Sequence, residues 1–312
     1  MARKGNAVLL GEPGGTEPGS VPCGQVWGCP VCAHAVRRAR GHEAGLAADA
    51  HRRSGGRVWA VDCALEPAGP GQLAARWHLL PAAWRRVVSG SGWGGEGRRT
   101  RRAGVVWTPR VTWSEPDGWH LVLRVLLLDR AGREELHQDV VARWTAQWAN
   151  GAGSAAGRVR WRPAGTRRET EDFMAAACDG SAGRRPQAVE LGPADLLARA
   201  RRTGAEAWWE LWREYAEAAA PASRGHRSPV AFSRGVRSVL LPGAVYQTDA
   251  ELAAEQGRAT LPPLTRPAWS RLAEDGGLQL QVLDAAGRGP GHLAWFLDDH
   301  GLRTVEKVRL VA

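Results

Sequence analysis

The sequence predicts an α+β protein, in which a central antiparallel sheet is flanked by helices and followed by a helical C-terminal region. Segments with the period-2 alternation of strands, at 55–65, 105–113, 118–128 and 157–163, are separated by segments with the 3.6-residue period of helices. The two middle strands are joined by the polar turn SEPDG (114–118), as in a hairpin. From residue 193 onward helical patterns dominate, so strands and helices are segregated as in α+β architectures.

The elements before the hairpin follow from local composition. Residues 1–22 are rich in glycine and proline and predict an irregular segment. A cysteine cluster and an alanine-rich helix over 33–53 precede the strand at 55–65. In a helix over 73–88, one side carries Leu73, Trp77, Leu80 and Trp84. The glycines and arginines of 89–104 then predict a flexible loop.

The segment 118–128, GWHLVLRVLLL, predicts a central strand because both of its faces are apolar. Alternation places leucines and valines on one face. The other face carries His120, Val122 and Arg124, followed by Leu126 and Leu128. A histidine and an arginine are unusual on a buried strand, so this face is a candidate functional surface.

The elements after the hairpin include a helix over 132–149 with Val140, Val141, Trp144 and Trp148 on its apolar side. A short basic strand follows at 157–163, and then a helix over 170–180 with Thr170 as its N-cap. Further helices are predicted over 193–202, 205–220 and 248–256, followed by a terminal set of helices from 267 to 300 and a last strand over 303–311. We therefore divide the chain into an irregular segment 1–22, a domain 23–220 and a mainly helical region 221–312.

The charge balance indicates a polyanionic partner. The net charge is +10, and all but two of the 42 basic residues are arginine. The choice of arginine over lysine is explained by GC-rich coding, but the excess of positive charge is not. The N-terminus lacks the apolar region of a secretory signal, and no run approaches the roughly 18 apolar residues of a membrane span. We expect a cytoplasmic protein that does not associate with membranes.

The 16 tryptophans allow two interpretations. Several fall at helical spacing, which favours packing in the core; these are Trp77, Trp84, Trp144, Trp148, Trp208 and Trp212. A surface on which bases stack is the alternative.

The segment CGQVWGCPVCAHAVRRAR contains Cys23, Cys29 and Cys32 in a C-x5-C-x2-C pattern. The tight CPVC spacing is typical of a zinc knuckle, for which His34, His42 or Cys63 would supply the fourth ligand. The alternative is a set of reduced thiols or a weak redox pair. A structural zinc ion is therefore one of two open interpretations.

Four arginines, Arg98, Arg99, Arg101 and Arg102, cluster in the predicted loop. They form either a solvated loop or a segment that contacts DNA phosphates, since a guanidinium group pairs well with phosphate.

Several phrases resemble the plasmid rolling-circle replication initiators (Rep proteins) of the HUH endonuclease superfamily. The cysteine segment is similar to their N-terminal part, and GVVWTPRVTWSEPDGWHLVLRVLLL is similar to their stretch ending in Gly-Trp-His-Pro-His-Leu-His. LWREYAEAAAPASRGHRSPVAFSRGV resembles the segment after their catalytic helix. The resemblance covers nearly the whole chain and implies an HUH/RRM-like fold for the domain 23–220.

The resemblance also implies a chemistry, in which strand histidines hold a divalent metal and a helix tyrosine attacks a DNA phosphodiester. The first histidine matches His120, but the next two ligand positions are Val122 and Arg124. The tyrosine and lysine positions of EDFMAAACDG are Phe173 and Ala176. No catalytic position is intact, and the two tyrosines of the chain, Tyr215 and Tyr246, fall elsewhere.

We therefore predict a DNA-binding Rep-like pseudoenzyme that has lost the catalytic metal and contacts DNA through the 98–102 arginines and Arg124. Its partners would be a single-stranded or hairpin origin and, in one scenario, an intact Rep protein. Two alternatives stay open: an active metal-dependent nicking Rep with a relocated nucleophile, and a zinc-stabilised interaction module that does not bind DNA.

Overall fold

The computed structural model describes residues 26–130, 134–175, 190–224, 228–256 and 264–302, the last range with short internal gaps. A five-stranded sheet with the order β4-β1-β3-β2-β5 lies at its centre, and every neighbouring pair is antiparallel. The strands are β1 (Arg57–Leu65), β2 (Gly104–Ser114), β3 (Gly118–Asp129), β4 (Ala156–Pro163) and β5 (Ala231–Phe232). The predicted α+β class is confirmed, and GWHLVLRVLLL is the middle strand.

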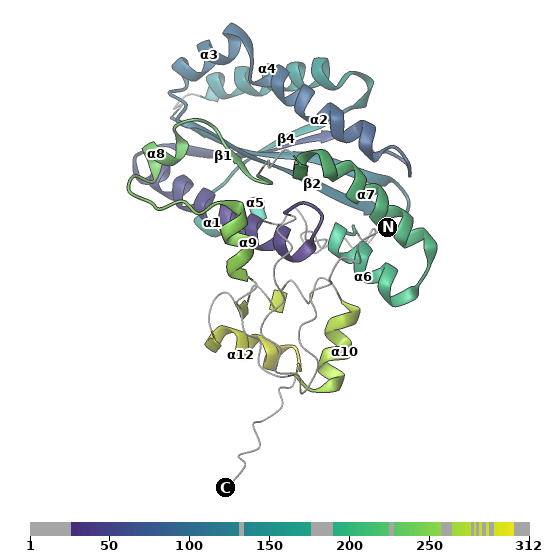
Figure 1. Ribbon diagram of the computed structural model, residues 1–312. Coiled ribbons are helices and arrows are strands. Elements are labelled where there is room, and N and C mark those ends of the chain that lie inside the picture. The colour runs from purple at the N-terminus through teal and green to yellow at the C-terminus, as the bar shows by residue number, and fades with distance from the viewer. Residues whose placement is uncertain are drawn as a thin grey trace.

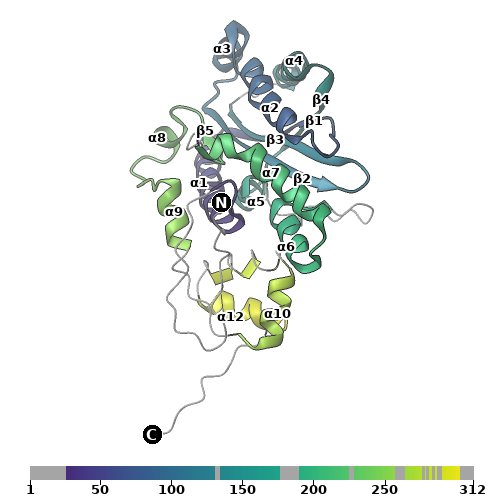
Figure 2. The ribbon, with the colours of Figure 1, turned by 45° about the vertical axis from the view of Figure 1, so that its right-hand side comes forward.

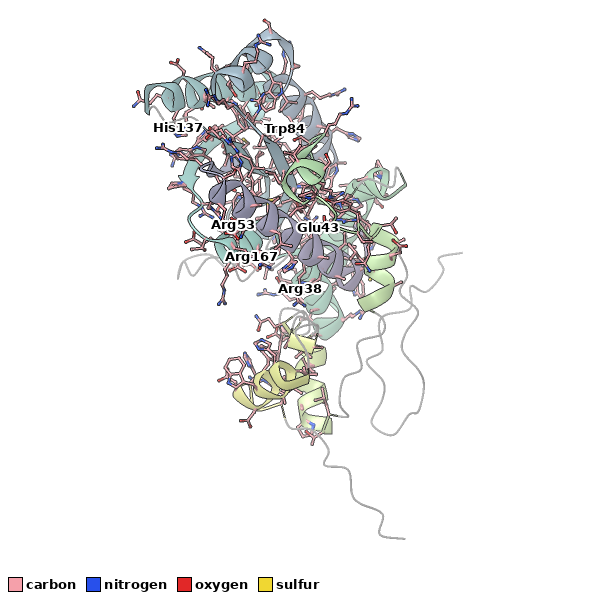
Figure 3. All side chains as sticks on the ribbon, turned by 90° about the vertical axis from the view of Figure 1, so that its left-hand side faces the viewer. Arg38, Glu43, Arg53, Trp84, His137 and Arg167 are labelled. Carbon is pink, nitrogen blue, oxygen red and sulfur yellow. The ribbon has the colours of Figure 1, made fainter. Side chains whose placement is uncertain are left out.

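Helices cover both faces of the sheet (Figures 1 and 2). The helices α2 (Leu73–Val87), α3 (Gly90–Arg99) and α4 (Glu134–Ala152) lie on one side. The helices α1 (Pro30–Arg53) and α5 (Arg167–Ala175) lie on the other. The remaining helices are α6 (Pro193–Thr203), α7 (Glu206–Arg224), α8 (Val236–Leu240), α9 (Asp249–Gln256), α10 (Arg266–Glu274) and α12 (Pro290–Asp299). Figure 3 separates the two layers: Trp84 and His137 lie in one, and Glu43, Arg53 and Arg167 lie in the other.

The β2–β3 hairpin turns at Gly118, whose φ of +84° lies in the left-handed region that glycine adopts without strain. A Cβ atom at this position would also lie 2.3 Å from the carbonyl oxygen of Ala68, so no other residue fits. The close approach allows Ala68 and Trp119 to form an antiparallel bridge, which fixes the segment after β1 against the start of β3.

Tryptophans form the core between the sheet and the layer of α2 and α4. Trp77, Trp84, Trp144 and Trp148 are buried, as their helical spacing predicts, and the rings of Trp84 and Trp144 meet edge to face at 5.6 Å. Trp208 and Trp212 of α7 are partly buried against the same cluster. The packing interpretation of these six tryptophans is confirmed.

The opposite face of the sheet is covered only in part by α1 and α5. Leu126 and Leu128 of β3 are buried there beside Phe173 and Met174 of α5. A Cβ atom on Gly45 would lie 2.4 Å from Cγ of Glu171, so the glycine allows α5 to lie close against α1. This contact holds α5 beneath the middle strand.

Residues 90–99, which the sequence predicts as part of a flexible loop, form the helix α3. Half of its residues are glycine, and each glycine costs a helix about 1 kcal/mol relative to alanine. Tertiary contacts overcome this cost: the buried carboxylate of Glu96 accepts hydrogen bonds from Arg102, Arg143 and the indole of Trp144. The loop prediction is wrong because two of these three contacts come from residues far away in the sequence, Arg143 and Trp144.

The start of α5 is also earlier than predicted. The helix begins at Arg167, and the side chain of Thr166 accepts a hydrogen bond from the backbone N–H of Glu169, whose carboxylate accepts one from Thr166 in return. This reciprocal pair is a capping box, readable in the sequence as Thr166-x-x-Glu169. Thr170 is therefore not the N-cap; it lies buried inside the helix and donates its hydroxyl to the carbonyl of Thr166.

The segment 264–302 has a hydrophobic cluster of its own, in which Leu272, Val282 and Leu297 are buried. The segment before it contacts helix α1 instead: Arg40 of α1 forms an ion pair with Asp249 of α9 at 2.7 Å. Both the predicted irregular segment 1–22 and the predicted strand 303–311 lie outside the described residues. Within the described ranges, no helix combines the length and the apolar character needed to cross a membrane.

Candidate functional site on the arginine face

The candidate site is the polar part of the sheet face that carries His120, Val122 and Arg124. Residues paired across an antiparallel sheet project to the same face, so the register places Arg110 beside Val122, Thr108 and Asp62 on either side of Arg124, and Arg160 beyond Asp62. We call this surface the arginine face, made of Asp62, Arg110, Arg124, Arg158, Arg160 and Arg162. It adjoins the apolar part of the same face, which α1 and α5 cover.

The structure brings together the strand and helix positions that the resemblance singles out. Arg124 donates a hydrogen bond from Nη1 to the carbonyl oxygen of Phe173 at 2.9 Å. Its guanidinium carbon lies 5.0 Å from the centre of the Phe173 ring, within the range of a cation–π contact. Strand β3 and helix α5 thus meet at this residue pair. Ala176, the other helix position, lies outside the described residues.

Arg124 is a strongly buried cation. Its side chain is 11% exposed, and burial lowers its pKa to about 10, assisted by the charges of Arg110 and Arg162. Asp62 and Glu190 oppose this shift. Because a pKa of about 10 lies well above neutral pH, Arg124 is charged at pH 7. Its Nε lies 3.5 Å from Oδ1 of Asp62, so an ion pair holds the guanidinium on its β1 side.

His120 lies at the polar end of the same strand and is partly exposed. Its Nε2 is 2.9 Å from the hydroxyl of Ser114, and the carboxylate of Asp117 lies 3.8 Å away. These contacts come from the hairpin turn and not from the sheet face. They tie the histidine to the turn, while Arg124 is tied to α5.

Glu190 adds a contact that sequence reasoning missed. Its carboxylate accepts a hydrogen bond from Arg110 at 2.6 Å, and Leu191 pairs with Trp113 in an antiparallel bridge. Burial raises the pKa of Glu190, but the charge and hydrogen bond of Arg110 outweigh it, so the pKa is lowered overall. Arg110 and Glu190 are 80 residues apart, and no local pattern links them.

The side chains on this face do not suit a divalent cation. Val122 has no lone pair, Arg124 is itself a cation, and the ring nitrogen Nε2 of His120 is engaged with Ser114. Within the described part of the chain, no three His, Cys, Asp or Glu side chains lie close enough to hold a metal.

The predicted zinc ligands are only partly described. Cys29 is the N-cap residue of α1, and Cys32 is buried in the main core in the first turn of that helix. Cys63 of β1 belongs to the same core cluster, where burial raises the pKa of its thiol. His34 is buried on α1, whereas His42 is exposed and lies 3.2 Å from Glu171. Cys23 lies outside the described residues, so the zinc site stays a prediction.

The 98–102 arginines and Arg124 lie on different faces of the sheet. Helix α3 belongs to the layer of α2 and α4, opposite α1 and α5 (Figure 2). Arg98, Arg99 and Arg101 are exposed there. Arg102 instead forms an ion pair with Glu96 at 2.9 Å and lies over the Trp93 ring, 3.2 Å from its centre. Arg102 therefore supports the fold.

Both tyrosines lie away from the contact between Arg124 and Phe173. Tyr215 is buried on α7, where its hydroxyl donates to the carbonyl of Trp27 at 2.8 Å. Tyr246 lies beside Arg237 of α8, and its hydroxyl donates to the carbonyl of Leu241.

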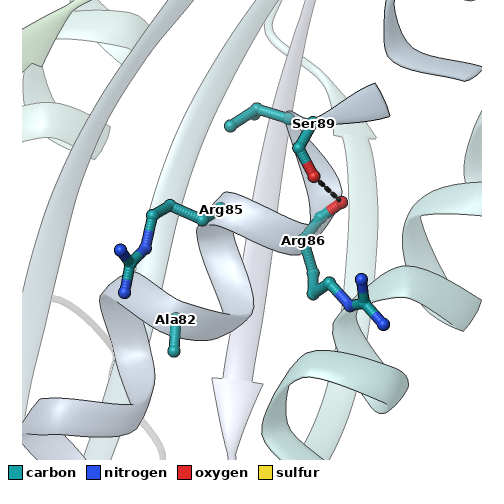
Figure 4. Close-up of a pocket in the computed structure, with 5 residues that line it drawn as sticks. Ala82, Arg85, Arg86 and Ser89 are labelled. Carbon is teal, nitrogen blue, oxygen red and sulfur yellow. Dashed lines mark hydrogen bonds between the residues drawn. The ribbon is translucent and has the colours of Figure 1, made fainter. Parts of the chain in front are cut away.

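A shallow pocket occurs at the end of α2, lined by Ala82, Arg85, Arg86, Val88 and Ser89 (Figure 4). Its internal hydrogen bond joins the hydroxyl of Ser89 to the carbonyl of Arg86. The pocket lies in the layer opposite the arginine face and contains no residue that the sequence singles out.

No family model and no solved structure matches this chain. Among curated proteins, the chain is 26% identical to "Protein rep" of Streptomyces lividans, over a match that covers 57% of this chain and 50% of the relative. The chain therefore spans about half the length of that protein. The match agrees with the Rep-like character that the sequence motifs suggest.

Proposed function

We propose that this chain is a DNA-binding relative of the rolling-circle replication initiators, and that it cannot nick or join DNA. Three findings support the replication role: the similarity to a Rep protein, the antiparallel sheet flanked by helices, and the net charge of +10. A positively charged surface attracts the phosphate backbone independently of any catalytic group.

The observation that carries the loss of nicking is the contact between Arg124 and Phe173. In the family that the motifs resemble, these positions belong to a metal ligand and to the attacking tyrosine. Here a guanidinium group occupies the ligand position and binds the backbone of the phenylalanine. A metal ion beside this guanidinium would be repelled, and phenylalanine has no oxygen with which to attack. Two parts of the reaction are thus replaced together.

Neither tyrosine offers a substitute nucleophile at this place. The Tyr215 side chain is 2% exposed and its hydroxyl is engaged with Trp27, so it would have to leave the core to reach DNA. Tyr246 is accessible but lies beside α8, whose neighbouring strand β5 is separated from β3 by β2. Attack by Tyr246 would need a separate site with its own phosphate-binding groups.

The test combines a covalent-adduct assay with a binding assay on the purified full chain. Single-stranded and hairpin DNA are incubated with protein and Mn²⁺ or Mg²⁺, and the products are separated under denaturing conditions. We expect binding that weakens steeply with salt, and no adduct with either metal. An adduct that disappears in Tyr246→Phe or Tyr215→Phe would overturn the proposal and identify a nicking enzyme with a relocated nucleophile.

Binding must be tested separately from chemistry, because the two parts of the proposal can fail independently. Absence of binding to every DNA form at low salt would reject the DNA-binding role and favour an interaction module.

The matched pair for the adduct assay is Tyr246→Phe and Phe232→Tyr, which remove and add one phenolic oxygen near the same α8 segment. We expect both variants to behave like the unmodified chain.

A further inference from the structure

The edge strand β4 carries a row of arginines that the proposed function does not yet use. Arg158, Arg160 and Arg162 alternate with Val159 and Trp161. The two apolar residues pack against the main core, and the three arginines are exposed on the opposite face. Side chains two residues apart on a strand are about 6.6 Å apart. The row is therefore a straight line of three positive charges along the outer strand of the sheet.

Nearby acids offset only part of the charge of this row. None of its three arginines forms an ion pair with a described residue. Asp62 is paired with Arg160 in the strand register, but its carboxylate lies 3.5 Å from Arg124. Glu169 lies near Arg162 and offsets part of its charge, but its carboxylate accepts hydrogen bonds from the backbone N–H groups of Gly165 and Thr166 and forms no ion pair with Arg162. Like charges at this spacing repel one another, so the row favours an anionic partner.

Arg162, the last arginine of the row, contacts the ring of Phe173. The guanidinium carbon of Arg162 lies 5.1 Å from the centre of the Phe173 ring, and that of Arg124 lies 5.0 Å from the same centre. Phe173 is thus the common neighbour of an exposed and a buried arginine.

We infer that Arg158, Arg160 and Arg162 form the surface that binds the phosphodiester backbone of an extended DNA strand. This inference rests on the proposed DNA-binding function and names its surface. A row of guanidinium groups suits successive phosphates of one strand, because each group can donate two parallel hydrogen bonds to a phosphate. The arginine row makes no contacts with bases, so its binding depends on charge and backbone geometry and not on the DNA sequence. The 98–102 arginines, on the other face of the sheet, take no part.

The test is the salt dependence of DNA binding by the full chain and by a variant with Arg158→Gln, Arg160→Gln and Arg162→Gln. For three phosphate contacts to a single strand, the plot of log K against log salt should become less steep by about 2. This corresponds to a roughly hundred-fold loss of affinity near 0.1 M salt. A lysine triple variant at the same positions should keep most of the slope. Circular dichroism should be unchanged because all three side chains are exposed, and Tm should fall only slightly, by the loss of the contact between Arg162 and Phe173.

The matched control replaces Arg98, Arg99 and Arg101 with glutamine, which removes the same charge from the opposite face. We expect this control to keep nearly the full slope with single-stranded DNA. If the control loses the slope and the β4 variant keeps it, the binding surface is on α3 and the inference is wrong. Parallel titrations with duplex DNA distinguish a single strand from a duplex as the preferred form.

Failure of the inference is distinguishable from failure of the proposed function. Unchanged DNA affinity in the β4 variant, with binding by the unmodified chain, would overturn the inference and leave the function intact. Self-association of that variant with unchanged DNA affinity would show that the row only protects an exposed sheet edge. Absence of binding by the unmodified chain would reject both.

Discussion

Replacing Arg102 with glutamine tests whether this residue supports the fold or contacts DNA. The Arg102 side chain is 8% exposed, lies 2.9 Å from the buried carboxylate of Glu96, and covers the ring of Trp93. Burial lowers its pKa to about 10, so it is charged at neutral pH. Glutamine preserves much of the length of the side chain but removes the charge and the stacked guanidinium group.

The expected cost follows from these two contacts. A hydrogen bond between charged groups contributes about 1.5–3 kcal/mol, and a desolvated cation–π contact about 0.5–2 kcal/mol. Arg143 remains beside Glu96 at 2.5 Å and limits the loss. We expect Arg102→Gln to lower the free energy of unfolding by about 2–4 kcal/mol, which corresponds to a fall in Tm of about 5–15 °C.

The assay is urea unfolding followed by tryptophan fluorescence, combined with DNA binding at one fixed salt concentration. Arg101→Gln is the matched control, because Arg101 is the adjacent residue and is exposed. We expect DNA affinity to change less than about two-fold in the Arg102 variant when measured well below its unfolding transition. Unchanged stability together with weaker DNA binding would refute this reasoning and restore Arg102 as a DNA contact.

Three further predictions concern other parts of the molecule. Val122→His combined with Arg124→His would place three alternating histidines on one face of β3. We expect this variant to bind Mn²⁺ in calorimetry. Mn²⁺ affinity no higher than that of the unmodified chain would contradict the assignment of the ligand positions. Burial lowers the pKa of His51 from 6.5 in spite of its hydrogen bond to a backbone carbonyl. The unfolded chain therefore takes up a proton that the folded chain resists, and the free energy of unfolding should fall as pH decreases from about 7.5 to 5.5. In His51→Gln this pH dependence should be smaller, and an equal slope in both proteins would exclude His51 as its source. If the cysteine cluster binds zinc, elemental analysis should find one ion per chain that is lost in Cys29→Ser; zinc-free protein would reject the site.

Much of the fold could be predicted because it follows from local periodicity. The two apolar faces of 118–128 predict a middle strand, and β3 is the middle strand. The spacing of Trp77, Trp84, Trp144 and Trp148 predicts burial, and all four are buried. These patterns are reliable because the apolar stripe of a helix or strand must be buried, whatever element it packs against.

The helix α3 shows where local patterns are insufficient. Its glycines favour a loop, and the sequence gives no sign that Glu96 will be buried. The helix forms because Arg143 and Trp144, almost fifty residues away, bind that carboxylate. Contacts at this separation depend on how elements pack, and no local window contains them.

The sequence by itself determined which chemical groups this protein has at the positions that matter. It has an arginine and a phenylalanine at the positions that match a metal ligand and a tyrosine in the Rep proteins it resembles, and it has alternating arginines on a short strand. Only the tertiary structure decided that Arg124 and Phe173 touch, and that the arginines of β4 lie on the sheet face opposite the layer that contains α3. The physical reason is that side-chain chemistry is a property of single residues, whereas the surface that side chains form together depends on strand register and on the side of the sheet that each helix covers.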